Sequence, residues 1–204
     1  MYDKATQSLW NTIEGQPVIG PLVDKGITLN TYPVITSTWG EWKKAHPESL
    51  VLSLRTGHRR DYSTGAAYRD YYATDDLMFP VPLDDRRLAN KQEVFIIRST
   101  DYKNEPLAIS TKFLKKNSLH HDEIGSEQFV IITDPKGGSR AYKNDGYTFK
   151  SYKKKVLTDT DGQVWTVHED YISLDDDTRL ERASSHNVFW FAWYNTYPDT
   201  RLVK

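Results

Sequence analysis

The stretch N-V-F-W-F-A-W-Y-N-T-Y-P at residues 187–198 is the densest aromatic run in the chain, and T-W-G-E-W-K-K-A-H-P at residues 38–47 is its counterpart. Both contain the pattern W-x-x-W-x-x-x-x-P. Four pairs of positions share a separation of 151 residues: Trp39 and Trp190, Trp42 and Trp193, Pro47 and Pro198, and Leu29 and Leu180. A second match, with an offset of 155, relates T-Q-S-L-W ending at Trp10 to D-G-Q-V-W ending at Trp165. The spacing therefore predicts an internal repeat in which the six tryptophans form three pairs.

The two copies of this repeat are unequal in length. A 151-residue copy that ends at Val203 would begin near Ser53, and an equal partner would begin about a hundred residues before Met1. Two explanations remain open: a unit of about 50 residues brackets an unrelated insert, or the chain begins inside its first copy. A first copy without its opening strands predicts a sheet edge in the first half that is either exposed or covered, by the other half or by a second chain through self-association.

The composition is that of a folded protein with a polar surface and an aromatic core. The 204 residues suit one domain or two small ones, and we expect one. Lysine and arginine number 27 against 28 aspartates and glutamates, which gives a formal net charge of −1. This balance argues against a nucleic-acid partner and against an acidic membrane surface.

Two absences narrow the chemistry further. There is no apolar run long enough for a membrane span and no apolar secretory core in M-Y-D-K-A-T-Q, so a cytoplasmic and an exported location both stay open. With no cysteine, the chain has no disulfide, thiolate nucleophile or cysteine-ligated metal.

Local patterns in the first half predict short strands and one capped helix. Glycines and prolines punctuate residues 1–35, which favours strands joined by turns. Thr38 and Glu41 have the spacing of a capping box, and Pro47 ends the helix by about His46. Val51, Leu52 and Leu54 are expected to form a buried strand.

The second half reads as a series of strands, expected at residues 94–97, 106–110, 129–133, 140–142, 147–149 and 164–167. N-D-G at residues 144–146 and D-T-D-G at residues 159–162 predict hairpin turns. We therefore predict an α+β fold, mostly antiparallel β with short helices, in which two related halves pack as one pseudo-symmetric body. Within a single domain of residues 1–204, the first half-repeat covers about 1–55, a linking loop 56–92 and the second repeat 93–204.

Five segments carry a resemblance to a known family: M-Y-D-K-A-T-Q-S-L-W at residues 1–10, G-P-L at 20–22, residues 38–47, T-G-H-R-R-D-Y at 56–62, and F-W-F-A-W-Y-N-T-Y-P-D-T at 189–200. On these segments the sequence resembles the bacterial family known as domain of unknown function 3179 over essentially its whole length. The resemblance implies a tandem arrangement whose first copy opens with strands and a C-P-L-C motif before the M-Y-D segment. That part is absent here, so the resemblance favours a chain that begins inside its first copy. No role of paired cysteines is carried over, and the resemblance implies no particular activity.

The aromatic and acidic clusters favour structural roles. Trp39 with Trp42, and Trp190 with Trp193, have the spacing of neighbours on one helical face, so we expect buried core anchors rather than a stacking platform for a sugar. The run H-H-D-E at residues 120–123 holds four metal-ligand types, but adjacent residues rarely converge on one ion, and we predict no metal site. The common nucleotide and hydrolase fingerprints are missing, which leaves any cofactor undefined.

The polar, tyrosine-rich segment of residues 56–76 is the predicted functional region, because it shows no period and holds clustered charges. One hypothesis is a binding or structural module for a small molecule or protein, with the binding residues Arg59, Arg60, Tyr62 and Tyr68. The alternative is a hydrolase- or lyase-like enzyme. In that case His58 and Asp61 would act in catalysis beside Arg59 or Arg60.

Overall fold

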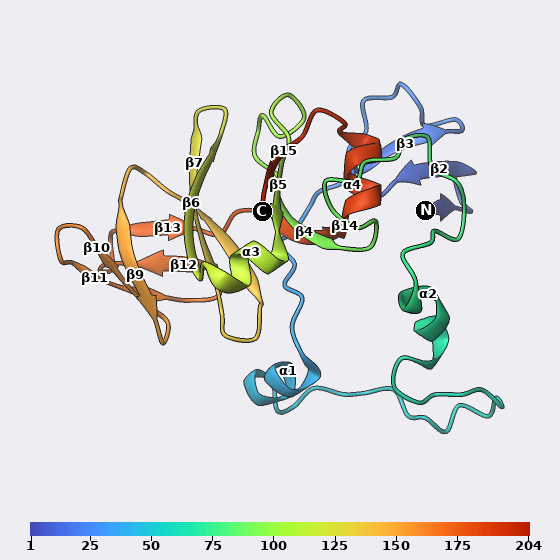
Figure 1. Ribbon diagram of the computed structural model, residues 1–204, viewed down its shortest axis with the longest axis horizontal. Coiled ribbons are helices and arrows are strands. Elements are labelled where there is room, and N and C mark those ends of the chain that lie inside the picture. Colours follow the sequence, from blue (N-terminus) through green and yellow to red (C-terminus); the bar gives the residue numbers. More distant parts are fainter.

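The computed structural model describes residues 1–204 and consists mostly of antiparallel β-sheets with a few short helices (Figure 1). The helices are α1 (Trp39–Ala45), the 3-10 turn η1 (Ala66–Tyr68), α2 (Arg69–Ala73), α3 (Thr111–Lys116) and α4 (Trp190–Thr196). The strands are β1 (Tyr2–Asp3), β2 (Ser8–Asn11), β3 (Gln16–Ile19), β4 (Glu93–Ile97), β5 (Leu107–Ser110), β6 (Leu119–Ile124), β7 (Glu127–Thr133), β8 (Ser139–Lys143), β9 (Phe149–Lys153), β10 (Val156–Asp159), β11 (Val164–Val167), β12 (Tyr171–Ser173), β13 (Arg179–Glu181), β14 (Ser185–Phe189) and β15 (Arg201–Val203). No helix has the length and apolar character that a membrane crossing requires.

The central sheet has the strand order β14-β4-β5-β15, and only the pairing of β15 with β5 is parallel. Both faces of β4 are buried, as its continuous apolar run requires. Val94 and Ile96 face α4, while Phe95 and Ile97 join a second cluster with β7 and β8. In Figure 1 this sheet and α4 lie in the middle of the molecule, with β6 to β13 on one side and β1 to β3 on the other.

The remaining second-half strands form two sheets that share a core. The orders are β6-β7-β8 and β13-β12-β11-β10-β9, and buried side chains from β7 and β8 contact Trp165 on β11. The D-T-D-G turn joins β10 to β11 as predicted. The hairpin predicted at N-D-G is wrong, because the flanking strands do not pair with each other: β8 pairs only with β7, and β9 pairs only with β10. The Asn144 side chain bonds both the amide and the carbonyl of Tyr147, and the chain passes there from one sheet to the other.

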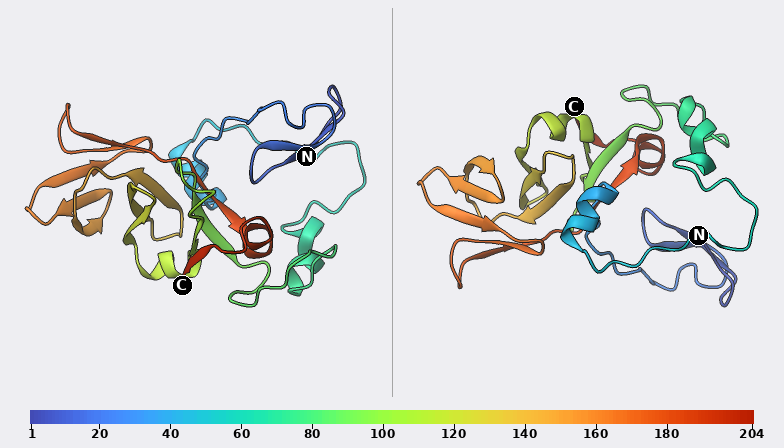
Figure 2. Two further views of the ribbon diagram at one scale, coloured as in Figure 1. Left: turned by 90° about the horizontal axis from the view of Figure 1, so that it is seen from above. Right: turned by 90° about the horizontal axis from the view of Figure 1, so that it is seen from below.

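Residues 20–92 contain the main departures from the expected structure. The capped helix is confirmed, since Thr38 Oγ1 accepts from the Glu41 amide at 3.3 Å. Trp39 and Trp42 are 55% and 45% exposed, so their predicted burial is wrong. The strand predicted at residues 51–54 is also wrong, because this segment belongs to no sheet and is exposed. The physical reason is common to both: no other strand of the chain lies against these segments. Figure 1 shows α1 outside the sheets, and the long connections on either side of it can be followed in Figure 2.

The third tryptophan pair lies in comparable local settings. Trp10 is on β2, the middle strand of β1-β2-β3, and Trp165 is on β11, which is flanked by β10 and β12. Both side chains are buried. A pseudo-symmetric body built from two halves, with the boundaries given above, stays a prediction. Self-association through an open edge also stays a prediction, and β3 is such an edge.

Candidate functional site

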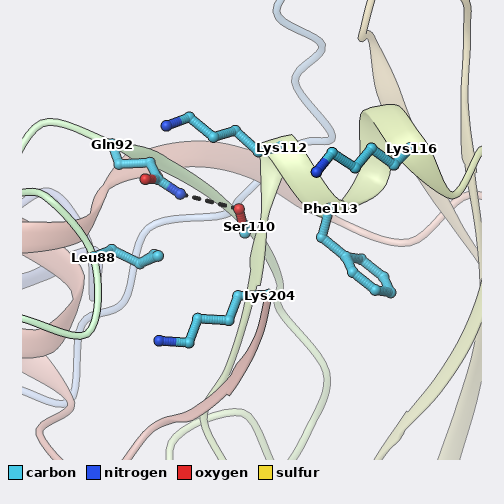
Figure 3. Close-up of a pocket in the computed structure, with 7 residues that line it drawn as sticks. All are labelled: Leu88, Gln92, Ser110, Lys112, Phe113, Lys116 and Lys204. Carbon is cyan, nitrogen blue, oxygen red and sulfur yellow. Dashed lines mark hydrogen bonds between the residues drawn. The ribbon is translucent and has the colours of Figure 1, made fainter.

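A pocket of about 410 Å³ opens where α3, the end of β5 and the end of β15 meet. It is lined by Leu88, Gln92, Ser110, Lys112, Phe113, Lys116 and Lys204. Three of these side chains are lysines, two are neutral polar groups and two are apolar. Figure 3 shows Lys112 and Lys204 extending on either side of the polar pair formed by Gln92 and Ser110.

Helix α3 places two of the lysines. Lys112 and Lys116 are four residues apart, so they lie on the same side of the helix. Leu114 is fully buried and anchors α3 in the core beside Phe113. Lys115 is not part of the pocket, because its side chain lies against Gly137. The same short helix therefore presents two lysines to the pocket and one away from it.

The polar floor of the pocket comes from the central sheet. Gln92 Nε2 donates to Ser110 Oγ at 3.0 Å, and Ser110 is buried at the end of β5. The parallel pairing of β15 with β5 brings Lys204 to the same place, where its Nζ donates to the Arg87 carbonyl at 3.1 Å. The pocket is thus assembled from residues that are far apart in the sequence.

The pocket is positive within a chain that is nearly neutral overall. No aspartate or glutamate lines it, and neither Lys112 nor Lys116 forms an ion pair or a side-chain hydrogen bond. Lysine ammonium groups are strongly hydrated point charges with three donors each. Arranged in this way around a polar floor, they favour an anionic oxygen ligand over a cation.

A partly buried polar cluster supports α3 from behind. The His120 ring packs edge-on against Phe113 at 5.1 Å between ring centroids, and His120 Nε2 lies 3.1 Å from Asp122 Oδ2. Arg201 Nη2 donates to Asp122 Oδ1 at 2.7 Å. Burial opposes ionisation of Asp122, but the hydrogen bonds from His120 and Arg201 outweigh it and lower its pKa. The cluster holds β6, β15 and α3 in register rather than reaching the pocket itself.

The H-H-D-E run divides between the two faces of β6, as alternation along a strand requires. His120 and Asp122 face Arg201, whereas His121 stacks on Phe149 and accepts from its backbone amide at 3.2 Å. Burial, and to a lesser extent the neighbouring His120, lowers the pKa of His121. Strand periodicity was the signal that could have separated these residues, but the strand over residues 119–124 was not among the predicted elements.

The predicted functional loop is exposed throughout residues 56–62. The Tyr62 hydroxyl and Thr56 Oγ1 share a hydrogen bond of 2.7 Å, and Asp61 Oδ1 accepts from the Ser63 amide at 2.9 Å. The hydrogen bonds from the hydroxyl and the amide of Ser63 lower the pKa of Asp61.

The predicted catalytic and binding side chains of this loop do not bond to one another. No hydrogen bond or ion pair joins the His58 side chain to Asp61, and neither Arg59 nor Arg60 has an acidic partner. Tyr68 is exposed and meets the edge of Tyr72 at 6.4 Å. The lysine-lined pocket contains none of these residues, and their roles stay predictions.

Fold and pocket together define a β-rich protein with short helices and a lysine-lined surface pocket. The chain belongs to the family described as protein of unknown function (DUF3179), whose model matches residues 1–200. The resemblance noted from the sequence segments is thereby confirmed. No curated protein and no solved structure matches the chain.

Proposed function

We propose that this protein is a binding module for a small anionic molecule, held in the lysine-lined pocket. The observation that carries the proposal is that Lys112, Lys116 and Lys204 line one pocket that has no lining carboxylate. An anion entering there meets ammonium donors and no carboxylate. This refines the hypothesis of a binding or structural module that the sequence supports.

The lining also restricts the shape of the ligand. The carboxylate or phosphate group is expected between the lysines and above the Gln92 and Ser110 pair, whose hydroxyl still has a proton to donate. Leu88 and Phe113 add apolar walls, so a ligand with an organic body gains additional contact. An aromatic or aliphatic phosphate or carboxylate fits this description better than a bare inorganic ion.

The pocket favours binding over turnover. Its single hydroxyl, Ser110, is hydrogen-bonded to an amide rather than to a general base, so it lacks the activation that a nucleophile needs. The enzyme hypothesis instead rests on His58 and Asp61, whose exposed loop is described above. No contact in that loop favours the enzyme over the binding module.

The test is a calorimetric titration of the protein with phenyl phosphate, pyrophosphate and phenylacetate at low salt. We expect binding of phenyl phosphate that weakens as ionic strength rises, because the contacts are partly exposed charge pairs. Lys116→Gln should weaken this binding by about threefold to fivefold, the effect of losing up to about 1 kcal/mol from one exposed charge contact.

The matched control is Lys115→Gln, which removes the same charge from the same helix but outside the pocket. It should leave the affinity within experimental error of the unmodified protein. Equal weakening by the two variants would indicate a diffuse surface effect and contradict the pocket. Absence of binding by all three probes at millimolar concentration would contradict the proposed function.

A further inference from the structure

Helix α1 and the turn after it repeat the local structure of α4 and its turn. Both helices have seven residues, and Trp42 Nε1 donates to Ser49 Oγ at 2.9 Å as Trp193 Nε1 donates to Thr200 Oγ1 at 2.8 Å. The backbone amide of His46 caps the C-terminal end of α1 by donating to the Trp42 carbonyl. The His46 ring also packs on Trp42 at 4.1 Å between ring centroids. Its counterpart Tyr197 packs on Trp193 at 4.6 Å. The two copies thus share side-chain bonds as well as sequence spacing.

In the second copy this motif is covered by two strands. Trp190 and Trp193 are fully buried against Val94, Ile96 and Ala108 from the inward face of β4 and β5. The turn is anchored to the same ribbon, because Thr200 Oγ1 donates to the Pro106 carbonyl at 3.0 Å. On either side of α4, β14 pairs with β4 and β15 pairs with β5. The covering element is therefore an antiparallel ribbon inserted between two flanking strands.

In the first copy the same motif stands uncovered. Trp39 and Trp42 are 55% and 45% exposed. Residues 50–52 correspond to β15 by the offset of 151. Leu50, Val51 and Leu52 are 98%, 67% and 93% exposed. Residues 34–38, which correspond to β14, belong to no sheet, although the Val34 amide donates to the Ser185 carbonyl. Exposed apolar surface of this extent, concentrated on one segment, is typical of an interaction surface.

We propose that residues 34–54 form a docking surface for an antiparallel two-stranded β-ribbon of a partner polypeptide, with an aliphatic inward face like that of β4 and β5. One partner strand would pair antiparallel with residues 34–38, and the other would pair parallel with residues 50–52. Trp39 and Trp42 would close over the ribbon as Trp190 and Trp193 close over β4 and β5. The β4–β5 ribbon of the same chain does not occupy this surface, because α4 already covers its inward face.

The choice of a ribbon over a helix follows from the two flanking segments. The Val34 amide already bonds Ser185 and the Thr38 carbonyl bonds the Trp42 amide, but residues 35–37 and 50–52 have no backbone–backbone hydrogen bond. A strand partner satisfies these groups while its side chains reach the tryptophans. A partner helix would cover the indole rings but leave both backbones unpaired. The docking surface shares no residue with the lysine-lined pocket, so a result that contradicts one proposal leaves the other untouched.

The experiment attaches a ribbon to the intact chain. The probe is a copy of Glu93–Ser110 joined to Met1 by a twenty-residue Gly/Ser linker, which spans about 25 Å on average. In the copy, Phe95→Thr, Ile97→Thr, Leu107→Thr and Ile109→Thr remove the outward apolar face, while Val94, Ile96 and Ala108 stay. Acrylamide quenching of fluorescence then reports on Trp39 and Trp42, because the other four tryptophans are buried.

We expect the attached ribbon to reduce quenching of the accessible tryptophans severalfold and to slow amide exchange at residues 34–38 and 50–52. A Trp39→Phe and Trp42→Phe double variant assigns the accessible signal. A control ribbon with Val94→Asp and Ile96→Asp should leave quenching unchanged. The proposal is overturned if the apolar ribbon gives no protection, or if the control protects equally. It is also overturned if the unmodified chain protects these tryptophans by itself as its concentration rises, because the occupant would then be a second copy.

Discussion

The backbone amide of Val34 donates to the carbonyl of Ser185 at 2.8 Å, and these two residues are separated by the repeat offset of 151. Corresponding positions of the two copies therefore contact each other directly. Such a contact between equivalent residues is what a local two-fold arrangement produces. It gives a specific point about which the proposed pseudo-symmetry can be tested, independently of the tryptophan helices.

Trp193→Ala should destabilise the protein far more than Trp42→Ala. Trp193 is fully buried, so removing its ring is expected to lower the free energy of unfolding by about 3–5 kcal/mol. Trp42 is 45% exposed in the same local motif, and its removal should cost under about 1 kcal/mol. Urea denaturation of the two variants measures the difference. Similar losses would mean that Trp42 is a core residue in solution.

His186 should make the protein less stable in mild acid. Burial, and secondarily the charge of Arg98, lowers the pKa of His186 to about 4 from its ordinary value near 6.5. Between these values the unfolded chain binds the proton more readily than the folded one, so stability falls as the pH drops from about 6.5 towards 4. Thermal melts across this range should show a smaller decline for His186→Gln. An unchanged slope would exclude His186 as the cause.

Gly20→Ala should disrupt the packing of β1, β2 and β3, whereas Gly26→Ala should have a smaller effect. Both glycines have a positive φ, but a Cβ at Gly20 would lie 2.6 Å from the Gln7 carbonyl oxygen and 2.8 Å from Ser8 Cα, whereas one at Gly26 meets nothing within 4 Å. Gly26→Ala should therefore cost about 1–2 kcal/mol through backbone strain alone, and Gly20→Ala more. Limited proteolysis within residues 1–20 tests the difference, and equal protection of the two variants would contradict the steric argument.

Arg59→Ala and Arg60→Ala should each change the free energy of unfolding by less than about 0.5 kcal/mol, because both side chains are exposed and lack an acidic partner. Thermal melting tests this expectation. A larger loss would show that the loop is tied to the body by these arginines. If stability is unchanged, the same variants report cleanly on ligand or partner binding at the predicted loop.

The elements that could be predicted from the sequence are those whose structure depends on residues close together in the chain. Thr38 and Glu41 lie three residues apart, and their cap forms without help from the rest of the chain. The strand at residues 94–97 was also predictable, since an apolar run of that length is typical of a buried strand. The strand predicted at residues 51–54 is wrong, because an apolar run of this kind becomes a strand only when another strand pairs with it.

The lysine-lined pocket was not predictable from the sequence. Lys115 and Lys116 are adjacent in the sequence, and only the unpredicted helix α3 places Lys116 in the lining of the pocket and Lys115 outside it. Lys204 reaches the site through a parallel strand pairing that joins the chain end to β5. No local pattern in the sequence contains this information.

The order of strands in the central sheet has a consequence for synthesis on the ribosome. The ribbon of β4 and β5 is complete at residue 110, but α4 begins only at residue 190, whereas α1 has already been made. Because chains emerge from their N-terminus, α1 is the first matching helix that the ribbon meets. Since the finished structure has Trp193 on the ribbon and Trp42 exposed, we expect a late exchange in which α4 takes the place of α1. A nascent chain halted before residue 190 should therefore shield Trp42, and release of the full-length chain should expose it again.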